Sequence, residues 1–394
     1  MRLQSSLETP SEIKILNSGF QMKRISLFLF LISFLISALS TPLSSGWAAE
    51  RKVPLILDTD MGTDDWLAFA FIAKNPKYDL LGISVVGNGL SPCPQAANNA
   101  SYLLGLVSKK DVPVACGSNW PMDGYASYPK PWRDITTTMR GEDLPIPNIL
   151  QIYGDSSALL VELLQKSSDP VEILALGAMT NIATTIKARP KLKKKIKRIT
   201  AMGGAVYVPG NLRVPGFTDQ LRNTKAEWNF YIDPVAAKIV FQSGIPIRLV
   251  PLDATNLVPL TVDFVQRVKA LPASPLQEFT ARTLNRVSNA LSTGEYYHWD
   301  PLAAVVADDP GICSYSLSKK FIISARLGND YGIDNGIART FFPTASSSGR
   351  KRFALSDKDA GASILDASGS MIDVCMEVPP AVFEQKYLDM LGRS

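Results

Sequence analysis

The chain has 394 residues, of which 46% are hydrophobic and 20% are charged. This composition excludes a disordered chain, a collagen-like fibre and a multi-span membrane protein. The net charge of +5 is too small to indicate nucleic acid as a partner. The single histidine, His298, excludes a metal site built from two or more histidine ligands.

The N-terminal segment has the pattern of a secretory signal. Lys23 and Arg24 precede an apolar run at residues 25–39, and small residues follow up to Ala49. The run is shorter than the ~20 apolar residues that a membrane span requires. A positive start, a short apolar run and a small-residue exit together indicate export to the periplasm or the extracellular space.

We therefore expect residues 1–48 to be a signal peptide and residues 49–394 to form the exported domain. Residues 1–21 could be an over-extended start, because Met22 stands directly before the positive charges. Cleavage would leave no stable membrane anchor, and a retained signal anchor is the alternative.

Export permits disulfide bonds between the four cysteines. Three full pairings of Cys93, Cys116, Cys313 and Cys375 are possible, and the sequence does not choose among them. Free buried thiols and a single bridge are further alternatives. The spacing of the cysteines matches no CxxC metal or redox motif.

The rest of the chain alternates short apolar runs with helical patterns. Strands are predicted at residues 53–57, 81–86, 112–115, 171–176, 199–202 and 247–250, and helices at residues 66–73, 96–107, 181–188 and 234–242. Continuous Val, Ile and Leu runs between helices are typical of a mostly parallel sheet covered on both faces. We therefore predict a single α/β domain, with long surface loops at residues 117–150 and 203–230 that could act as lids.

The main chemical signal is an acidic string that follows the first predicted strand. Asp58, Asp60, Asp64 and Asp65 fall within eight residues. The carboxyl ends of parallel strands are where ligands bind in open α/β sheets. The dipole of the next helix contributes only ~0.3–1 kcal/mol per charge, which is too little to hold four carboxylates together. A hard divalent cation with oxygen ligands, Ca²⁺ or Mg²⁺, would offset their repulsion.

The string from Asp58 to Asp65 reads Asp-Thr-Asp-Met-Gly-Thr-Asp-Asp and resembles the DTDxGxDD signature of the inosine-uridine-preferring nucleoside hydrolases. The resemblance implies an α/β fold and hydrolysis of the N-glycosidic bond of ribonucleosides, which releases ribose and a free base. Further blocks extend it, in the family's order, over roughly residues 53–390: Val86-Gly87-Asn88, Leu176 to Ala183, Met202 to Ala205, Gly210-Asn211, Ala226 to Pro234 and Asp300 to Ala303.

The resemblance implies a Ca²⁺ ion on the floor of a pocket. Its ligands would be Asp60, Asp65, Asp300 and one backbone carbonyl at a strand end, that of Leu176. The ion would hold the attacking water and two ribose hydroxyls, and Asp60 would be the general base for that water. Asp58 would orient the ligands.

The resemblance also implies which residues bind the sugar. Asp64 would bind ribose hydroxyls, and the surrounding carboxylates and amides would stabilise the positive charge that develops on the sugar. The other sugar residues would be Asn211, Glu227 and Asn229 around the 3′- and 5′-hydroxyls, with Asn88 and Met202 lining the ring.

The leaving base is the remaining problem, because it departs poorly as an anion. Many family members carry a histidine directly before the late aspartate, where it protonates the base. Here Trp299 holds that position before Asp300. This resembles the purine-preferring branch, in which indoles stack on both faces of the purine and favour its protonation. The resemblance therefore implies a catalytic role for Trp299, a stacking role for Trp132 and a preference for purine ribonucleosides.

Two features qualify this interpretation. His298 stands one residue before the expected donor position, so its side chain should point elsewhere, and we expect it at the rim or partly buried and satisfied by neighbours. Gly62 and Asn88 resemble the branches of the family without a purine preference.

Two other functions are compatible with the acidic string. Haloacid-dehalogenase-type phosphatases carry a DxDx(T/V) motif, in which Asp58 would be the nucleophile and Mg²⁺ the cofactor, but Gly62 stands where Thr or Val is needed. A non-catalytic nucleoside- or ribose-binding protein would keep the metal site without turnover. As a nucleoside hydrolase, the protein would form a homo-oligomer, a dimer or a tetramer, as the family resemblance suggests.

Overall fold

The computed structural model describes residues 51–122, 127–142, 152–153, 155–215, 218–219, 221–287, 296–325 and 358–393. The expected signal peptide lies outside these ranges, so the expectations about it stay predictions. Among the helices of the described ranges, none combines the length and the apolar character that crossing a membrane requires.

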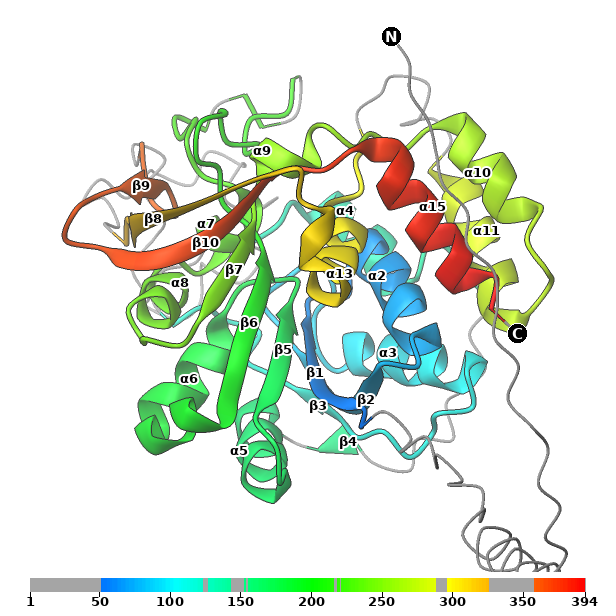
Figure 1. Ribbon diagram of the computed structural model, residues 1–394, viewed down its shortest axis with the longest axis horizontal. Helices are drawn as coiled ribbons and strands as arrows, with labels where there is room; N and C mark the ends of the chain where they lie inside the picture. Colours follow the sequence, from blue (N-terminus) through cyan, green and yellow to red (C-terminus); the bar gives the residue numbers. More distant parts are fainter. Residues whose placement is uncertain are drawn as a thin grey trace, which may run out of the picture. The chain divides into compact units, whose positions relative to one another are not determined.

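Ten described strands form one sheet with the order β4-β3-β2-β1-β5-β6-β7-β10-β8-β9 (Figure 1). Neighbouring strands from β4 to β10 are parallel, and β8 and β9 are antiparallel additions at one edge. The strands are β1 (Val53–Thr59), β2 (Tyr78–Val85), β3 (Val114–Cys116), β4 (Ile152–Tyr153), β5 (Val171–Ala175), β6 (Ile196–Met202), β7 (Ile247–Val250), β8 (Tyr315–Ile323), β9 (Ser363–Leu365) and β10 (Ser370–Glu377).

Helices cover both faces of this sheet, as predicted (Figure 1). They are α2 (Thr63–Lys74), α3 (Gln95–Leu106), α4 (Lys130–Thr137), α5 (Ser156–Lys166), α6 (Thr180–Ala188), α7 (Trp228–Ile232), α8 (Pro234–Phe241), α9 (Leu252–Thr255), α10 (Val262–Lys269), α11 (Pro275–Arg286), α13 (Trp299–Asp308) and α15 (Pro380–Leu391), with short 3₁₀ turns at Pro190–Lys195 and Pro310–Ile312.

The central strand β1 is buried on both sides, because its side chains alternate between two hydrophobic clusters. Leu55 and Leu57 pack in the cluster of α2, α3, α13 and α15, whereas Ile56 packs in the cluster of α5, α6 and α8. This explains why β1 is a continuous apolar run rather than an alternating pattern. The α/β fold class with a mostly parallel sheet is confirmed.

The predicted loop at residues 117–150 is only partly correct. Residues 130–137 form the helix α4, which begins with a proline in its first turn. Thr136 of α4 donates to the carbonyl of Leu90 at 2.8 Å, and Asn99 of α3 donates to the carbonyl of Thr137 at 3.2 Å. These bonds hold α4 beside the loop that follows β2. An eight-residue helix is too short to show a clear period among polar and proline residues, which is why the sequence did not reveal it.

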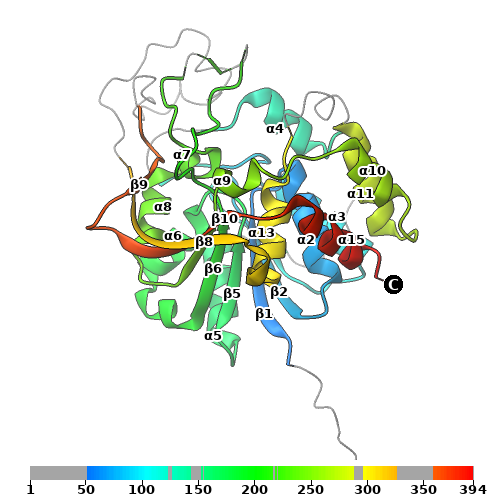
Figure 2. The same cartoon turned by 45° about the horizontal axis from the view of Figure 1, so that its top comes forward.

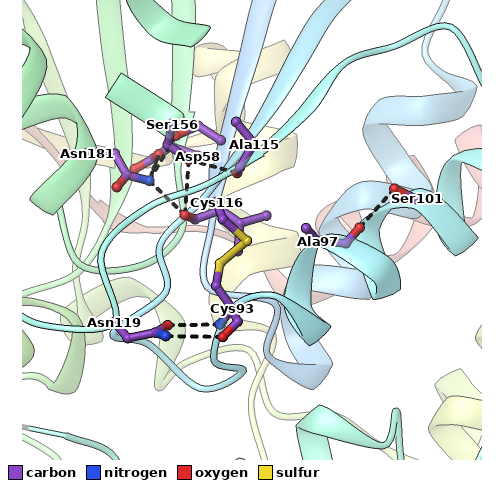
Figure 3. The surroundings of a disulfide bond; sticks show 11 residues. Asp58, Cys93, Ala97, Ser101, Ala115, Cys116, Asn119, Ser156 and Asn181 are labelled. Atoms are coloured by element: carbon purple, nitrogen blue, oxygen red, sulfur yellow. Dashed lines mark hydrogen bonds between the residues drawn. A yellow bond between two sulfur atoms is a disulfide. The ribbon is translucent and has the colours of Figure 1, made fainter. Parts of the chain in front are cut away.

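The structure decides the cysteine pairing that the sequence left open. Cys93 is bonded to Cys116, and Cys313 is bonded to Cys375. Figure 3 shows the first bridge, which joins the loop after β2 to the end of β3. Asn119 reinforces this join, because its side chain accepts from the Cys93 amide at 2.9 Å and donates to the Cys93 carbonyl at 3.1 Å.

The two bridges should contribute different amounts to stability. Cys313–Cys375 spans 62 residues and Cys93–Cys116 spans 23. Because cross-linking restricts the unfolded chain more when the closed loop is longer, we expect serine pairs to lower the free energy of unfolding by about 4 and about 3 kcal/mol, respectively. Denaturant unfolding of the two double variants measures this order. A larger loss for the shorter loop would contradict the loop-entropy explanation.

Candidate active site

The site lies where the parallel strands end. Helices α4, α7 and α9 lie on this side of the sheet (Figure 2). Asp60 directly follows β1, and two glycines allow the neighbouring strand ends to approach it closely. A Cβ atom on Gly89 would lie 2.1 Å from the Asp60 Cβ, and one on Gly177 would lie 2.7 Å from it. Only glycine therefore fits at these two positions, and the carboxylate of Asp60 is clamped between two backbone segments.

Three further carboxylates gather beside Asp60. One oxygen each from Asp64, Asp65 and Asp300 lies within 4.8 Å of the others. Asp64 and Asp65 stand in the first turn of α2, and Asp300 stands in the first turn of α13. The N-termini of two helices thus meet at this point, and their dipoles favour negative charge there. The sequence placed Asp300 in this group only through the family resemblance, since 234 residues lie between it and Asp65.

Asp65 is the best held of these carboxylates. It accepts hydrogen bonds from the Gly62 amide at 2.8 Å, from the Asp60 amide at 3.2 Å and from the Thr59 hydroxyl. The role of Thr59 was not predicted, because a hydroxyl next to two aspartates gives no distinct signal in the sequence. These bonds fix the Asp65 side chain before any ligand binds.

Two carboxylate oxygens of the group lack such bonds. Asp60 Oδ2 and Asp300 Oδ1 are buried and have no hydrogen-bond partner among the described residues. Burial, and then the neighbouring carboxylates, raise the pKa values of Asp60 and Asp300 well above their ordinary range. Buried polar atoms without partners are rare and require an explanation. A divalent cation with oxygen ligands accounts for both orphaned atoms, so the residues present fit a metal site.

The predicted backbone ligand, Leu176, lies at the end of β5 near the same floor. Its carbonyl accepts from the Asn229 side chain at 3.1 Å, which leaves one lone pair for a cation. The same amide group of Asn229 also donates to the Met202 carbonyl at 3.3 Å. Asn229 therefore ties the ends of β5 and β6 together, a role beyond the sugar contact predicted for it.

Tyr128 is a neighbour that the sequence did not reveal. Its hydroxyl donates to Asn229 Oδ1 at 2.8 Å, and its ring stacks on Trp228 with centroids 5.1 Å apart. A tyrosine in a proline-rich loop carries no pattern that points to a residue of α7, 101 positions further along the chain, so only the fold brings the two together.

Glu227 caps the helix that carries Asn229. Its carboxylate accepts from the amides of Asn229 at 2.8 Å and Gly204 at 3.0 Å, and burial raises its pKa to about 7. Asn211 reaches the same helix, because its Oδ1 accepts from the Trp228 amide at 3.2 Å. The structure thus brings Asn211, Glu227 and Asn229 together around α7, although 15 residues separate the first two in the sequence.

Asp58 lies beneath the site rather than in it. Its side chain is fully buried and accepts from the Asn181 amide at 3.2 Å (Figure 3). The same Asn181 nitrogen donates to Ser84 Oγ at 2.9 Å and to the Val85 carbonyl at 3.0 Å. Burial raises the pKa of Asp58 to about 7. A carboxylate enclosed in this way is unsuited to be the phosphatase nucleophile considered above.

The aromatic residues predicted at the base side form two groups. Trp299 opens α13, and its ring lies 5.0 Å from the ring of Tyr296 and 5.7 Å from that of Tyr297. Trp132 lies on α4 instead of in a loop, and its ring makes a T-shaped contact with that of Trp228, with centroids 5.5 Å apart. The stacking of a base between Trp132 and Trp299 stays a prediction.

We expected His298 at the rim or partly buried, but its side chain is fully buried. It lies between the rings of Phe264 of α10 and Phe383 of α15, with centroids at 4.6 and 4.8 Å. Burial lowers its pKa to about 3, so the ring is neutral. The prediction failed because the helices that pack behind α13 contribute an apolar surface that is distant in the sequence. The expectation that His298 is not the proton donor agrees with this position.

Comparison with known proteins identifies the family. The model of the family described as inosine-uridine preferring nucleoside hydrolase matches residues 55–379. The pyrimidine-specific ribonucleoside hydrolase of Shewanella sp. strain MR-4 is 32% identical over 248 residues, which cover 63% of this chain and 71% of that protein.

Solved structures show the same fold. The inosine-uridine preferring nucleoside hydrolase from Bacillus anthracis has a TM-score of 0.66 at 19% identity and covers 86% of this chain and 99% of its own. The purine-preferring ribonucleoside hydrolase from Gardnerella vaginalis has a TM-score of 0.65 at 22% identity, with coverages of 86% and 98%.

The chain belongs to the inosine-uridine preferring nucleoside hydrolase family. It is an N-glycosyl hydrolase whose substrate is a ribonucleoside. The phosphatase and the non-catalytic binding protein are thereby set aside.

The raised pKa values predict how pH acts on the metal-free protein. Burial holds the pKa of Asp58 and Glu227 at about 7, and burial with the nearby Asp65 holds that of Asp64 at about 8. The unfolded chain releases these protons near pH 4, so the folded state binds more protons between pH ~4 and ~8, and its stability falls as pH rises through this window. We expect a lower Tm at pH 8 than at pH 5 in chelator.

Added Ca²⁺ or Mg²⁺ should raise Tm more at pH 8 than at pH 5, because protons compete with the cation for the same carboxylates. Thermal denaturation at both pH values, with chelator and with each cation, measures this. A cation effect that is equal at the two pH values would argue against a carboxylate site.

Proposed function

We propose that the protein is an exported, Ca²⁺-dependent ribonucleoside hydrolase that prefers purine nucleosides. The observation that carries the metal requirement is the pair of buried oxygens without partners, Asp60 Oδ2 and Asp300 Oδ1, within a group of carboxylates. Asp60, Asp65, Asp300 and the Leu176 carbonyl would hold the ion. When bound, Ca²⁺ supplies Lewis acidity, which lowers the pKa of water at the site.

Asp60 is suited to be the general base. Its Oδ2 is assigned to the cation, whereas its Oδ1 accepts from the Gly62 amide at 3.2 Å and keeps a second lone pair for the proton of the attacking water. Gly89 and Gly177 hold this carboxylate in place, so the proton acceptor is positioned before the substrate binds. The carboxylates of Asp64 and Glu227 favour the positive charge that develops on the sugar.

Trp299 supports the purine preference. It directly precedes Asp300 at the start of α13, so its position is tied to that of a proposed metal ligand. An indole face stabilises a protonated purine through cation–π attraction, whereas the neutral, enclosed His298 does not reach a leaving base.

A preference for pyrimidine nucleosides is the second candidate. Relatives at about one-third identity, among them the protein of Shewanella sp. strain MR-4, are named pyrimidine-specific. Turnover of inosine and uridine by the same preparation decides between the two.

Export and oligomerisation belong to the same proposal. The signal pattern of residues 1–48 supports export to the periplasm or the extracellular space. Two disulfide bonds fit an oxidising compartment, since reducing compartments keep thiols free. A dimer or tetramer is proposed from the family resemblance.

Free ribose released from inosine, adenosine, guanosine and uridine tests the reaction and its metal. We expect release with Ca²⁺ and none after chelation. Asp60→Asn should lower kcat by about 10²–10⁴-fold, which is the usual contribution of general-base catalysis, because the amide keeps the side-chain size and cannot accept the proton. Wild-type-like Tm and circular dichroism serve as the control for folding. Unchanged turnover in the chelator would refute the metal requirement. Unchanged turnover of Asp60→Asn would refute its role as the general base.

Trp299→Ala tests the role of the indole. We expect kcat for inosine to fall far more than kcat for a nitrophenyl riboside, because the nitrophenyl leaving group needs no protonation. The matched control is Trp132→Ala, which should raise KM for inosine more than it lowers kcat if this ring only stacks. Equal losses of Trp299→Ala on the two substrates would refute leaving-group assistance.

A further inference from the structure

A buried chain of hydrogen bonds leads from the start of α8 to Asn88, and the reaction described above does not use it. Asp233 caps α8 and is fully buried, Thr180 opens α6 with 3% of its surface exposed, and Asn88 follows β2 with 4% exposed. Thr180 Oγ1 donates to Asp233 Oδ2 at 2.7 Å, and Asn88 Nδ2 donates to Thr180 Oγ1 at 2.9 Å. Three segments that are distant in the sequence thus share one chain of bonds.

The direction of these bonds is set at Asp233. Its Oδ1 accepts from the Ala236 amide at 3.0 Å, and its Oδ2 accepts from the Met122 amide at 2.8 Å. Backbone amides can only donate, so both carboxylate oxygens are held as acceptors. The hydroxyl of Thr180 must therefore point its single proton at Asp233.

This choice passes on to Asn88. Because the Thr180 hydroxyl already donates its only proton to Asp233, its oxygen can only accept from Asn88. The Asn88 amide must therefore present its nitrogen to Thr180. The other end of the amide, Asn88 Oδ1, then points away from Thr180. Among the described residues, this buried oxygen has no hydrogen-bond partner.

The free end of the amide belongs to a residue next to the acidic floor. Asn88 is followed by Gly89, whose backbone lies directly against the Asp60 side chain. The Asn88 oxygen gains nothing from carboxylates, since they are acceptors too. It requires a donor, and the donors that a ribonucleoside brings to this floor are its sugar hydroxyls.

We propose that Asp233 and Thr180 are positioning residues that lock the Asn88 amide so that its Oδ1 accepts a hydrogen bond from a ribose hydroxyl. This deepens the proposed function, on which it rests, and it uses the place beside the sugar ring that the family resemblance implies for Asn88. Without the bond to Thr180, the Asn88 amide could turn and present its two N–H donors to the sugar. These donors cannot accept a hydrogen bond from a ribose hydroxyl. The lock therefore contributes to recognition of ribose without touching it.

Thr180→Val is the test variant, because it keeps the side-chain shape and removes the hydroxyl. We expect kcat/KM for the best ribonucleoside to fall about tenfold, which corresponds to about 1.4 kcal/mol. The matched control is Thr180→Ser, which keeps the hydroxyl and should retain wild-type kcat/KM. Asp233 is less suitable for substitution, because it also caps α8 and its loss could unfold that helix.

Deoxy substrates separate positioning from general damage. The 2′-, 3′- and 5′-deoxy analogues of that ribonucleoside each lack one hydroxyl. We expect the ratio of wild-type to Thr180→Val kcat/KM to drop to about one with the analogue that lacks the accepted hydroxyl, and to stay about tenfold with the other two. A loss that is the same for all three analogues would overturn the proposal in favour of a structural role.

Asn88→Ala distinguishes failure of this proposal from failure of the sugar assignment. If Asn88→Ala leaves kcat/KM unchanged, the sugar contact of Asn88 and the positioning role of Thr180 and Asp233 are both overturned. If Asn88→Ala lowers kcat/KM and Thr180→Val does not, only the positioning role is overturned. The proposal requires kcat/KM of the double variant Asn88→Ala/Thr180→Val to equal that of Asn88→Ala alone, because Thr180 has no amide left to orient once Asn88 is alanine.

The Ca²⁺ concentration that half-activates Thr180→Val should match that of the wild type. A large shift would overturn the sugar contact in favour of a metal contact.

Discussion

The structure depends on holding several carboxylates together at the carboxyl edge of a buried sheet. Burial raises the pKa values of Asp60, Asp65 and Asp300, and repulsion between carboxylates raises those of Asp60 and Asp300 further, so the arrangement is costly without compensation. Backbone amides at the start of α2 offset part of this cost. The remaining orphaned oxygens, on Asp60 and Asp300, are the ones left for a cation. The same constraint therefore favours the binding of a metal cation between these carboxylates.

The surrounding hydrogen bonds keep this edge rigid. Asn181 links Asp58 of β1 to β2, and Asn229 links the end of β5 to the end of β6. Thr180 and Asp233 extend the system to the loop that carries Asn88. Asn181 and Asn229 thus join neighbouring strands, whereas Thr180 and Asp233 join two helix starts to the loop after β2. Such links suit an enzyme that must hold a sugar while its glycosidic bond breaks.

Much of the fold and of the acidic site could be predicted from the sequence. The exceptions are contacts between residues that are far apart along the chain. The apolar run of β1 and the acidic string after it are local patterns, so the strand, the helix α2 and the position of Asp60 at a strand end followed from them. Asp300 was grouped with them only through the family resemblance. His298 was expected at a rim and is enclosed by Phe264 and Phe383, which belong to helices that no local pattern brings to it.

By itself, the sequence determined the α/β class, the acidic centre and the nucleoside hydrolase family, because these depend on hydrophobic periodicity and on residues adjacent along the chain. The tertiary structure alone decided the cysteine pairing, the contact of Tyr128 with Asn229 and the direction of the Asn88 amide. Pairing depends on which cysteines the fold brings within bonding distance. The amide direction depends on where two backbone N–H groups point at Asp233, and neither property is encoded in residue order.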